Sequence, residues 1–191
     1  MESPRKSPLL LTPRLTVRML DEAEAFEVAR FHRVNQAHLE AFSPRAPEGF
    51  FTEDFWRVRI GKCREDFQAD LAVSLFLFES GKPQVVAGTI SFTQISRGPA
   101  QSCMLGYKLG AEFQGQGLMT EALKSTIAYT FGELNLHRIQ ASYLTDNHRS
   151  GAVLERLGFE SVGIARDYLR IDGRWRDHFL TAKTNPAWRE T

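Results

Sequence analysis

Short runs of apolar residues, or of apolar residues alternating with polar ones, recur along the chain and predict strands. The last such segment, residues 168–180, is interrupted by Asp172-Gly173. An Asp-Gly pair between two alternating runs is typical of a β-hairpin, because both residues tolerate the positive φ of a tight turn. Ser80-Gly81-Lys82-Pro83 separates two earlier runs in the same manner. The predicted strands are residues 71–78, 85–92, 104–109, 137–144 and the two runs within 168–180, preceded by a first strand around Leu15 and Val17.

Two predicted helices precede most of these strands. Asp21 and Glu24 form a capping-box pattern ahead of an apolar stripe. Thr52 is a residue type that caps helix N-termini, and the helix that it starts extends to about Phe67. Residues 43–50, which contain two prolines, form the loop between the two helices.

Two more helices separate the later strands. One follows Gly115 and Gly117. The other is short: Asp146 or Asn147 suits its N-cap, and Gly158 suits the left-handed position that ends it.

The order of the elements is β, α, α, three β, α, β, α, two β. This order predicts an α/β (mixed α+β) protein in which a central, twisted, mixed β-sheet has helices on both faces. We find no internal repeat and no low-complexity linker, so we expect a single domain, residues 1–191, whose core spans about 9–185.

The segment from Gln114 to Leu123 leads from a predicted strand into a predicted helix. Glycines at such a junction let a ligand reach the backbone, where unpaired N–H groups and the helix dipole favour a phosphate. A P-loop fits poorly, since Leu118 and Met119 stand where Lys and Ser or Thr are needed. A dinucleotide fingerprint fits weakly, since Thr120 replaces its third glycine. Two interpretations remain: a site for a diphosphate ligand, and a tight strand-to-helix turn that binds nothing.

The order of motifs resembles that of a known family. A strand, Gln-x-x-Gly-x-x, a helix, a strand, Asn-x-x-Ser at 147–150, a helix, Leu-Gly-Phe at 157–159 and a hairpin follow one another. This is the order in the GNAT superfamily of acetyl-CoA-dependent N-acetyltransferases. Residues 105–180 and the opening 11–18 are most similar to the RimJ type, the ribosomal-protein-alanine N-acetyltransferases. The resemblance implies the GNAT acyl-CoA N-acyltransferase fold.

The resemblance also implies where acetyl-CoA, the cosubstrate, would bind. In this family the fourth strand is splayed from the fifth, and the pantetheine arm hydrogen-bonds to the free edge of the fourth strand. Backbone groups of Tyr107, Lys108 and Leu109 would bind that arm, and Asn147 would contact a pantetheine amide. The pyrophosphate would lie against the backbone of seven consecutive residues: Gln114, Gly115, Gln116, Gly117, Leu118, Met119 and Thr120.

The family further implies direct attack of the amine on the thioester in a ternary complex. Ser150 matches a serine near the thioester sulfur, where its hydroxyl can donate to the developing thiolate; alternatively, it only satisfies the helix start. Asp167 matches an acidic position proposed as the base; alternatively, it is a solvated strand residue. Tyr143 is the third candidate catalytic residue, and it points from its strand toward the same gap or into the core. Some relatives carry a strand glutamate where this chain has Cys103, and a helix tyrosine where it has Leu154.

The missing strand glutamate bears on the acceptor. Deprotonating an α-amine at neutral pH costs roughly 1 kcal/mol, against roughly 4–5 kcal/mol for lysine. A weak base or a water relay therefore suffices for a protein N-terminus. Together with this argument, the resemblance to the RimJ type implies that the acceptor is the N-terminal alanine of a ribosomal protein. The alternatives are another peptide or small-molecule amine, or a non-catalytic acyl-CoA-binding or ribosome-assembly module.

Composition and charge narrow the possible classes of protein function further. A formal net charge of +1, with no basic stripe interleaved with aromatics, excludes a strong polyelectrolyte role, and we expect no nucleic-acid binding. The two cysteines and five histidines show no metal-ligand spacing, so we expect no metal. We find neither an apolar run long enough for a membrane span nor a signal-peptide pattern, and we therefore expect a cytoplasmic protein that does not engage membranes.

Overall fold

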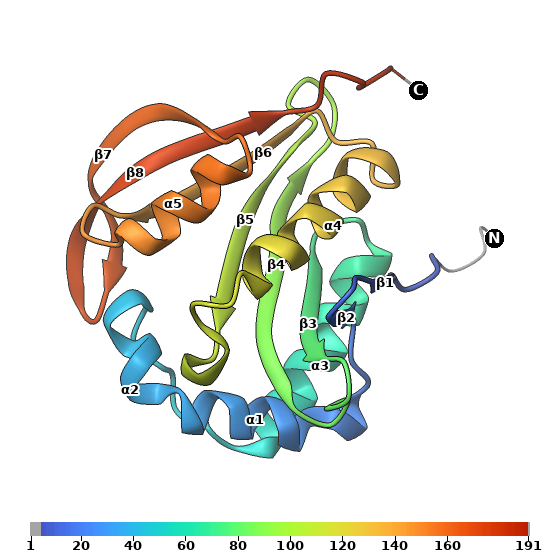
Figure 1. Ribbon diagram of the computed structural model, residues 1–191, viewed down its shortest axis with the longest axis vertical. Coiled ribbons are helices and arrows are strands. Elements are labelled where there is room, and N and C mark those ends of the chain that lie inside the picture. The colour runs from blue at the N-terminus through green and yellow to red at the C-terminus, as the bar shows by residue number, and fades with distance from the viewer. Residues whose placement is uncertain (1–4, 191) are drawn as a thin grey trace.

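The computed structural model describes residues 5–190 and contains one eight-stranded sheet, in the order β1-β2-β3-β4-β5-β6-β8-β7 (Figure 1). Only β5 and β6 run parallel; all other neighbours are antiparallel. The strands are β1 (Leu9–Leu11), β2 (Leu15–Arg18), β3 (Val73–Glu79), β4 (Val86–Ser96), β5 (Ser102–Leu109), β6 (Arg138–Leu144), β7 (Glu160–Ile171) and β8 (Arg174–Thr184).

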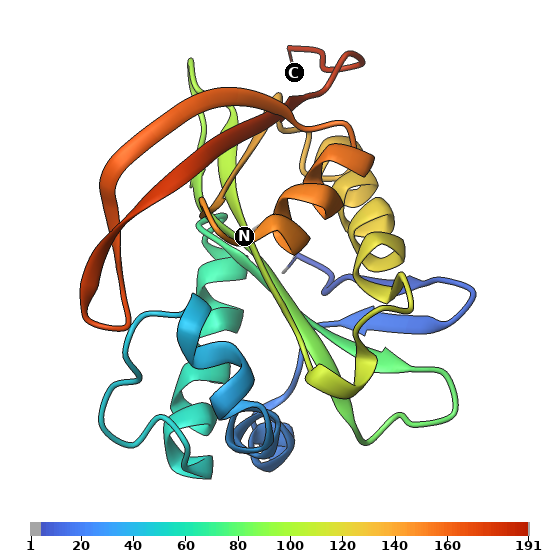
Figure 2. The same ribbon diagram turned by 60° about the vertical axis from the view of Figure 1, so that its left-hand side comes forward.

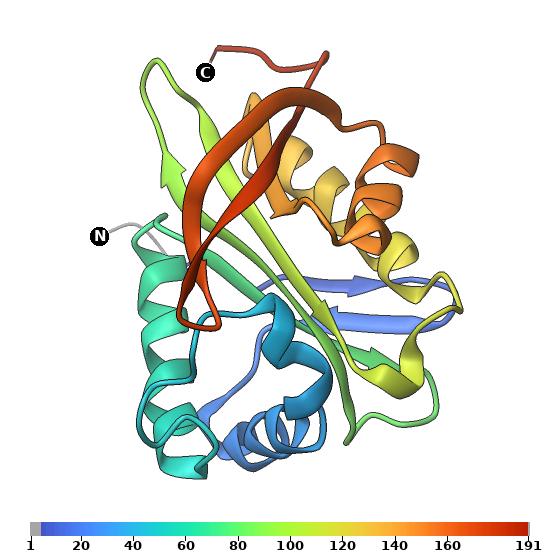
Figure 3. The same cartoon turned by 90° about the vertical axis from the view of Figure 1, so that its left-hand side faces the viewer.

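Helices cover both faces of this sheet, as predicted. In Figure 3, α1 and α3 lie on one side of the sheet, and α4 and α5 lie on the other. The helices are α1 (Ala25–Val34), α2 (Gln36–Leu39), α3 (Glu53–Gln68), α4 (Leu118–Gly132) and α5 (His148–Arg156), with short 3-10 turns at Glu22–Glu24, Glu40–Phe42 and Ala111–Phe113.

Strand β3 shows how one strand serves both faces. Leu75 and Leu77 belong to the larger core cluster, which includes the buried side chains of α4. Phe76 and Phe78 belong to a second cluster, with side chains of α1 and with Ile60 of α3. Because successive side chains of a strand point to opposite faces, the unbroken apolar run in β3 is what a doubly covered strand requires.

The helix cap and the helix ending that the sequence predicts both form in the structure. The side chain of Thr52 accepts a hydrogen bond from the Phe55 N–H, which caps α3. At the end of α5, the N–H groups of Gly158 and Phe159 donate to the carbonyls of Glu155 and Leu154. Gly158 has a φ of 75°, so this is a Schellman ending, with glycine in the left-handed position.

Two elements were not predicted. β1 is three leucines long, too short for an alternating pattern to show, and it pairs with β2 at the sheet edge. α2 is a single turn that continues from α1 at Asn35. Both elements contribute residues to the site described below, so the sequence prediction lacked part of the surroundings of that site.

The β7–β8 hairpin arches away from the rest of the sheet (Figure 2). Its turn, Asp172-Gly173, has φ values of 44° and 76°, as expected for the predicted tight turn. The Asp172 N–H donates to the Ser43 carbonyl at 3.1 Å, and the Asp172 carboxylate lies 3.6 Å from Arg45. The hairpin turn therefore rests on the loop between α2 and α3.

Within residues 5–190, no helix combines the length and the apolar character that crossing a membrane requires.

Candidate active site

Strand β5 has one free edge where the sheet splits. It pairs with β6 only along Ser102–Leu105, opposite Arg138–Ala141. Its second half pairs with β4, and in the described part of the chain no strand adjoins the other edge. Unpaired backbone groups on that edge can bind an extended ligand, as an added strand would. This edge carries the three residues predicted to hold pantetheine: Tyr107, Lys108 and Leu109.

The glycine loop leads from this strand, through the 3-10 turn, into α4. Gly115 and Gly117 have φ values of 74° and 76°, which side-chain-bearing residues adopt only with strain. A Cβ on Gly115 would meet no atom within 4 Å, and one on Gly117 would lie 3.8 Å from an Arg14 nitrogen. The backbone conformation requires the glycines, and their open side leaves room for a ligand.

Helix α4 begins directly after the loop, with Gly117 as its N-cap. The side chains of Leu118 and Met119 are buried in the larger core cluster. Both residues can therefore contact a ligand through their backbone only. The N–H groups of a first helical turn have no partner within the helix, and they carry the positive end of its dipole.

An open cleft of about 740 Å³ lies at this helix start. Arg14 connects the β1–β2 turn to the cleft: it donates from Nε to Glu121 at 2.7 Å and from Nη1 to the Gln116 carbonyl at 2.9 Å. The cleft is thus lined by three basic residues, Arg14, Lys124 and Arg156, beside a helix N-terminus, and its one carboxylate, Glu121, is held by Arg14. Its lining residues are Leu11, Thr12, Pro13, Arg14, Gly115, Gly117, Thr120, Glu121, Lys124, Ser125 and Arg156.

The side chain of Gln114 connects the glycine loop to α2 and to α5. The sequence did not indicate these contacts. Its Nε2 lies 2.7 Å from Nε2 of His38 in α2, and its Oε1 accepts from Arg149 in α5 at 2.8 Å. The Gln116 amide donates to the Glu112 carbonyl. These side chains fix the loop, and within the described part of the chain the N–H groups of Gly115 and Gly117 have no hydrogen-bond partner.

Two hydroxyl groups meet across the gap between β5 and β6. The Tyr107 Oη lies 2.6 Å from the Ser150 Oγ and 3.2 Å from the Ser150 carbonyl oxygen. Burial raises the pKa of Tyr107 to about 12. From the sequence only a backbone role is expected for Tyr107, because no local pattern indicates that residues so far apart pair.

Tyr143 lies on the β6 side of the same gap. Its ring sits under the first turn of α5, where a Cβ on Gly151 would come within 2.9 Å of its Oη. It also packs against Phe179, with ring centroids 5.4 Å apart. Of the two orientations left open by the sequence, the ring packs partly against the core and remains half-buried.

Asn147 caps α5, since its side chain accepts from the Ser150 N–H at 3.2 Å. Its Oδ1 is engaged within the helix, and its Nδ2 group remains as a donor. Because this cap satisfies the helix start, the Ser150 hydroxyl is free to pair with Tyr107.

Asp167 lies on an exposed bulge of β7, between Ala165 and Leu169, and has a φ of 48°. Its N–H donates to the Asp177 carboxylate at 2.9 Å. The Asp177 carbonyl in turn accepts from Thr145 at 3.4 Å, just before the α5 cap. Asp167 is thus tied to the end of β6 from which α5 starts, through a partner that the sequence did not reveal.

A buried basic pair lies against the site on the α1 side of the sheet. Burial lowers the pKa of Lys108. Burial, and then the charge of Lys108, lowers the pKa of His32 to about 3. Because of this low pKa, His32 is neutral at physiological pH. Its ring stacks on Trp56, with centroids 4.6 Å apart.

Cys103 does not have the surroundings of a nucleophile. Cys103 lies in the paired half of β5, and burial raises its pKa to about 12. It is therefore a thiol at neutral pH, whereas attack requires the thiolate. Among the described residues, no cluster of three or more His, Cys, Asp or Glu side chains is arranged to hold a metal ion.

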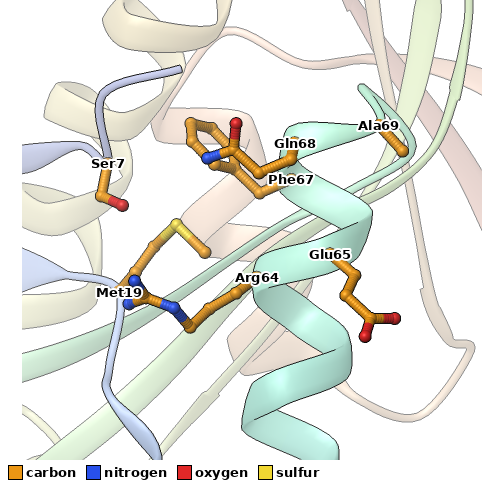
Figure 4. Close-up of a pocket in the computed structure, with 7 residues that line it drawn as sticks. All are labelled: Ser7, Met19, Arg64, Glu65, Phe67, Gln68 and Ala69. Atoms are coloured by element: carbon orange, nitrogen blue, oxygen red, sulfur yellow. The ribbon is translucent and has the colours of Figure 1, made fainter. Parts of the chain in front are cut away.

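A second hollow, of about 480 Å³, lies beside α3 (Figure 4). Its one basic side chain, Arg64, is paired with Asp21 at 2.7 Å. None of its lining residues belongs to β5, α4 or α5, so it is separate from the site. They are Ser7, Met19, Arg64, Glu65, Phe67, Gln68 and Ala69.

Comparison with known proteins identifies the family. Residues 14–160 match the model of the acetyltransferase (GNAT) domain. The [ribosomal protein uS5]-alanine N-acetyltransferase of Escherichia coli is 40% identical over 179 residues, covering 94% of this chain and 92% of that protein. This chain belongs to the GNAT acetyltransferase family.

Solved structures of GNAT acetyltransferases agree. The ribosomal-protein-S5-alanine acetyltransferase of Vibrio fischeri superposes with a TM-score of 0.92 at 34% identity, covering 96% of this chain and all (100%) of that one. RimJ of Mycobacterium smegmatis, solved in complex with CoA-disulfide, gives 0.87 at 25% identity, covering 98% and 91%. The predicted family, fold and acyltransferase class are thereby confirmed, which disfavours the alternative of a non-catalytic acyl-CoA-binding or ribosome-assembly module.

Proposed function

We propose that this GNAT acetyltransferase transfers the acetyl group of acetyl-CoA to the α-amine of an N-terminal alanine of a ribosomal protein, by direct attack in a ternary complex in the cytoplasm. The acceptor follows from the uS5-alanine acetyltransferase that is 40% identical over 94% of the chain. The observation that best supports acetyl transfer from acetyl-CoA is the free edge of β5 beside the glycine loop.

The fit to acetyl-CoA rests on two features that match two parts of the molecule. The glycine loop and the first turn of α4 offer backbone N–H groups to the pyrophosphate, with Lys124 and Arg156 in the adjoining cleft. The free backbone of Tyr107–Leu109 offers strand-like hydrogen bonds to the pantetheine amides. In this proposal the thioester would lie near the Tyr107–Ser150 hydroxyl pair.

The reaction needs little from the protein besides positioning. As the amine nitrogen bonds to the thioester carbon, the C–S bond breaks and its electron pair moves to sulfur. Ser150 would donate a hydrogen bond to that thiolate, and Asp167, or water ordered near it, would take the proton that the amine loses. A covalent cysteine intermediate is disfavoured, because Cys103 is buried and protonated.

A thiol-release assay with a panel of acceptors tests this function. The panel contains an alanine-starting peptide, a serine-starting peptide, an N-terminally blocked peptide with one lysine, a polyamine and an aminoglycoside. We expect release of free CoA with the alanine-starting peptide at a kcat/KM at least tenfold above all the others. Turnover of the polyamine or aminoglycoside alone would overturn the acceptor while leaving the family untouched.

A further inference from the structure

We propose that Tyr107 is a positioning residue for Ser150, so that the two hydroxyls act as one hydrogen-bond donor to the departing thiolate. This inference rests on the proposed place of Ser150 next to the thioester sulfur. It goes beyond that role, because Tyr107 would otherwise contribute only its backbone to the site.

The first support is the position of Tyr107. It lies in the half of β5 that has separated from β6, and its side chain spans the opening to reach α5. Its Oη is 2.6 Å from the Ser150 Oγ, within the usual range for a hydrogen bond between hydroxyls. The contact joins the free strand edge directly to the start of α5.

The second support is that each hydroxyl of this pair has one proton to donate. A carbonyl oxygen only accepts, so the 3.2 Å contact to the Ser150 carbonyl requires Tyr107 to donate there. In the 2.6 Å contact either hydroxyl can be the donor, so the Ser150 Oγ–H can donate to the Tyr107 Oη while the Tyr107 proton points to the carbonyl. When charge develops on sulfur, Ser150 can turn its proton to the sulfur, and Tyr107 can turn its own proton to the Ser150 Oγ.

This exchange makes no covalent bond and transfers no proton between the residues. It gives the Ser150 oxygen a donor of its own while it donates to the thiolate, and such chains strengthen each bond in them. A phenol whose pKa is raised to about 12 by burial keeps its proton throughout. Lys108 faces His32 on the other side of the sheet, and Arg149 is engaged by Gln114. Tyr143, the titratable neighbour within the gap, packs against Phe179 and makes no hydrogen bond to either hydroxyl in the described part of the chain.

A double-mutant cycle tests the coupling. We expect Tyr107→Phe to lower kcat about tenfold with unchanged calorimetric affinity for CoA, and Ser150→Ala to lower it by roughly 10–1000-fold. The double variant should be no slower than Ser150→Ala, because Tyr107 acts only through that hydroxyl. A tenfold loss that persists in the Ser150→Ala background would overturn the inference. Tyr129→Phe, which removes a half-buried hydroxyl from α4, is the matched control and should keep the wild-type rate.

A second measurement does not depend on the acceptor. The thiol of bound CoA is titrated by its thiolate absorbance, with desulfo-CoA as the reference for protein signals. We expect a lower thiol pKa in the wild type than in Tyr107→Phe, and equal values in Ser150→Ala and the double variant. Equal values in the wild type and Tyr107→Phe would refute the role of Tyr107. If the wild type acetylates only amines other than N-terminal alanine, the proposed acceptor fails. The double-mutant cycle then uses that amine, and the thiol titration is carried out unchanged.

Discussion

At the scale of single residues, the site combines backbone binding with a few side chains held by long-range partners. Ser150 is held by the Asn147 cap and the Tyr107 hydroxyl, and Asp167 is held by Asp177. The types of these residues follow from the motif positions. Their partners do not, because Tyr107 and Ser150 are 43 positions apart and meet only when the sheet splits.

Asp167→Asn tests the proposed base. We expect kcat/KM for an alanine-starting peptide to fall roughly 100-fold, with a changed dependence on pH, because a positioned proton acceptor is removed. Asp172→Asn is the matched control, since Asp172 is also a hairpin aspartate at positive φ. An unaltered rate and pH profile in Asp167→Asn would assign proton removal to water.

His32 makes the stability of the protein depend on pH. Its pKa is about 3 in the folded protein and about 6.5 when unfolded, so below pH 6.5 the unfolded chain binds the extra proton. Stability is therefore lost as the pH falls from 6.5 toward 3. Between pH 7 and pH 5 this amounts to roughly 2 kcal/mol.

The measurement is urea unfolding of His32→Gln at both pH values. We expect the variant to lose about 2 kcal/mol less than the wild type between pH 7 and pH 5. The exposed residue His148 supplies the control, His148→Gln, which should keep the wild-type difference. A difference in His32→Gln equal to that of the wild type would contradict the buried, neutral assignment.

At the scale of elements, short-range signals were sufficient for most of the fold. The Thr52 cap, the Gly158 helix ending and the Asp172-Gly173 turn each depend on neighbours within a few residues, and all three form as predicted. The parts that were missed depend on distant contacts. β1 is a strand only because β2 is beside it, and the anchoring of the glycine loop by Arg14 and His38 joins segments 76 or more positions apart.

Gly117→Val tests the junction of the loop and α4. The branched side chain would strain a residue with a φ of 76° and enter the space from which a pyrophosphate approaches the helix. We expect the dissociation constant for CoA to rise at least tenfold, as measured by calorimetry.

Gly98→Val separates strain from binding. Gly98 also has a positive φ, 64°, with open space around it, and lies in the β4–β5 turn. Both variants should lose about 1–2 kcal/mol of stability from backbone strain, but only Gly117→Val should lose affinity. Equal CoA affinity in a folded Gly117→Val protein would remove the phosphate site from this loop.

At the scale of the whole molecule, the two core clusters share one sheet. Alternating residues of β3 contribute to both clusters, so neither face can lose its packing without exposing the other side of the same strand. We therefore propose that residues 1–191 fold as one cooperative domain. Scanning calorimetry should give a single transition whose van't Hoff and calorimetric enthalpies agree. Two resolved transitions would show that the faces unfold separately.

The central claim is transfer to an α-amine, and a pair of peptides tests it most directly. Both peptides contain one internal lysine; one starts with a free alanine, and the other starts with the same alanine already blocked. After incubation with acetyl-CoA, fragmentation mass spectrometry locates the acetyl group. If the enzyme acetylates α-amines, the free alanine gains one acetyl group and the blocked peptide gains none. Acetylation of the lysine in both peptides would contradict it.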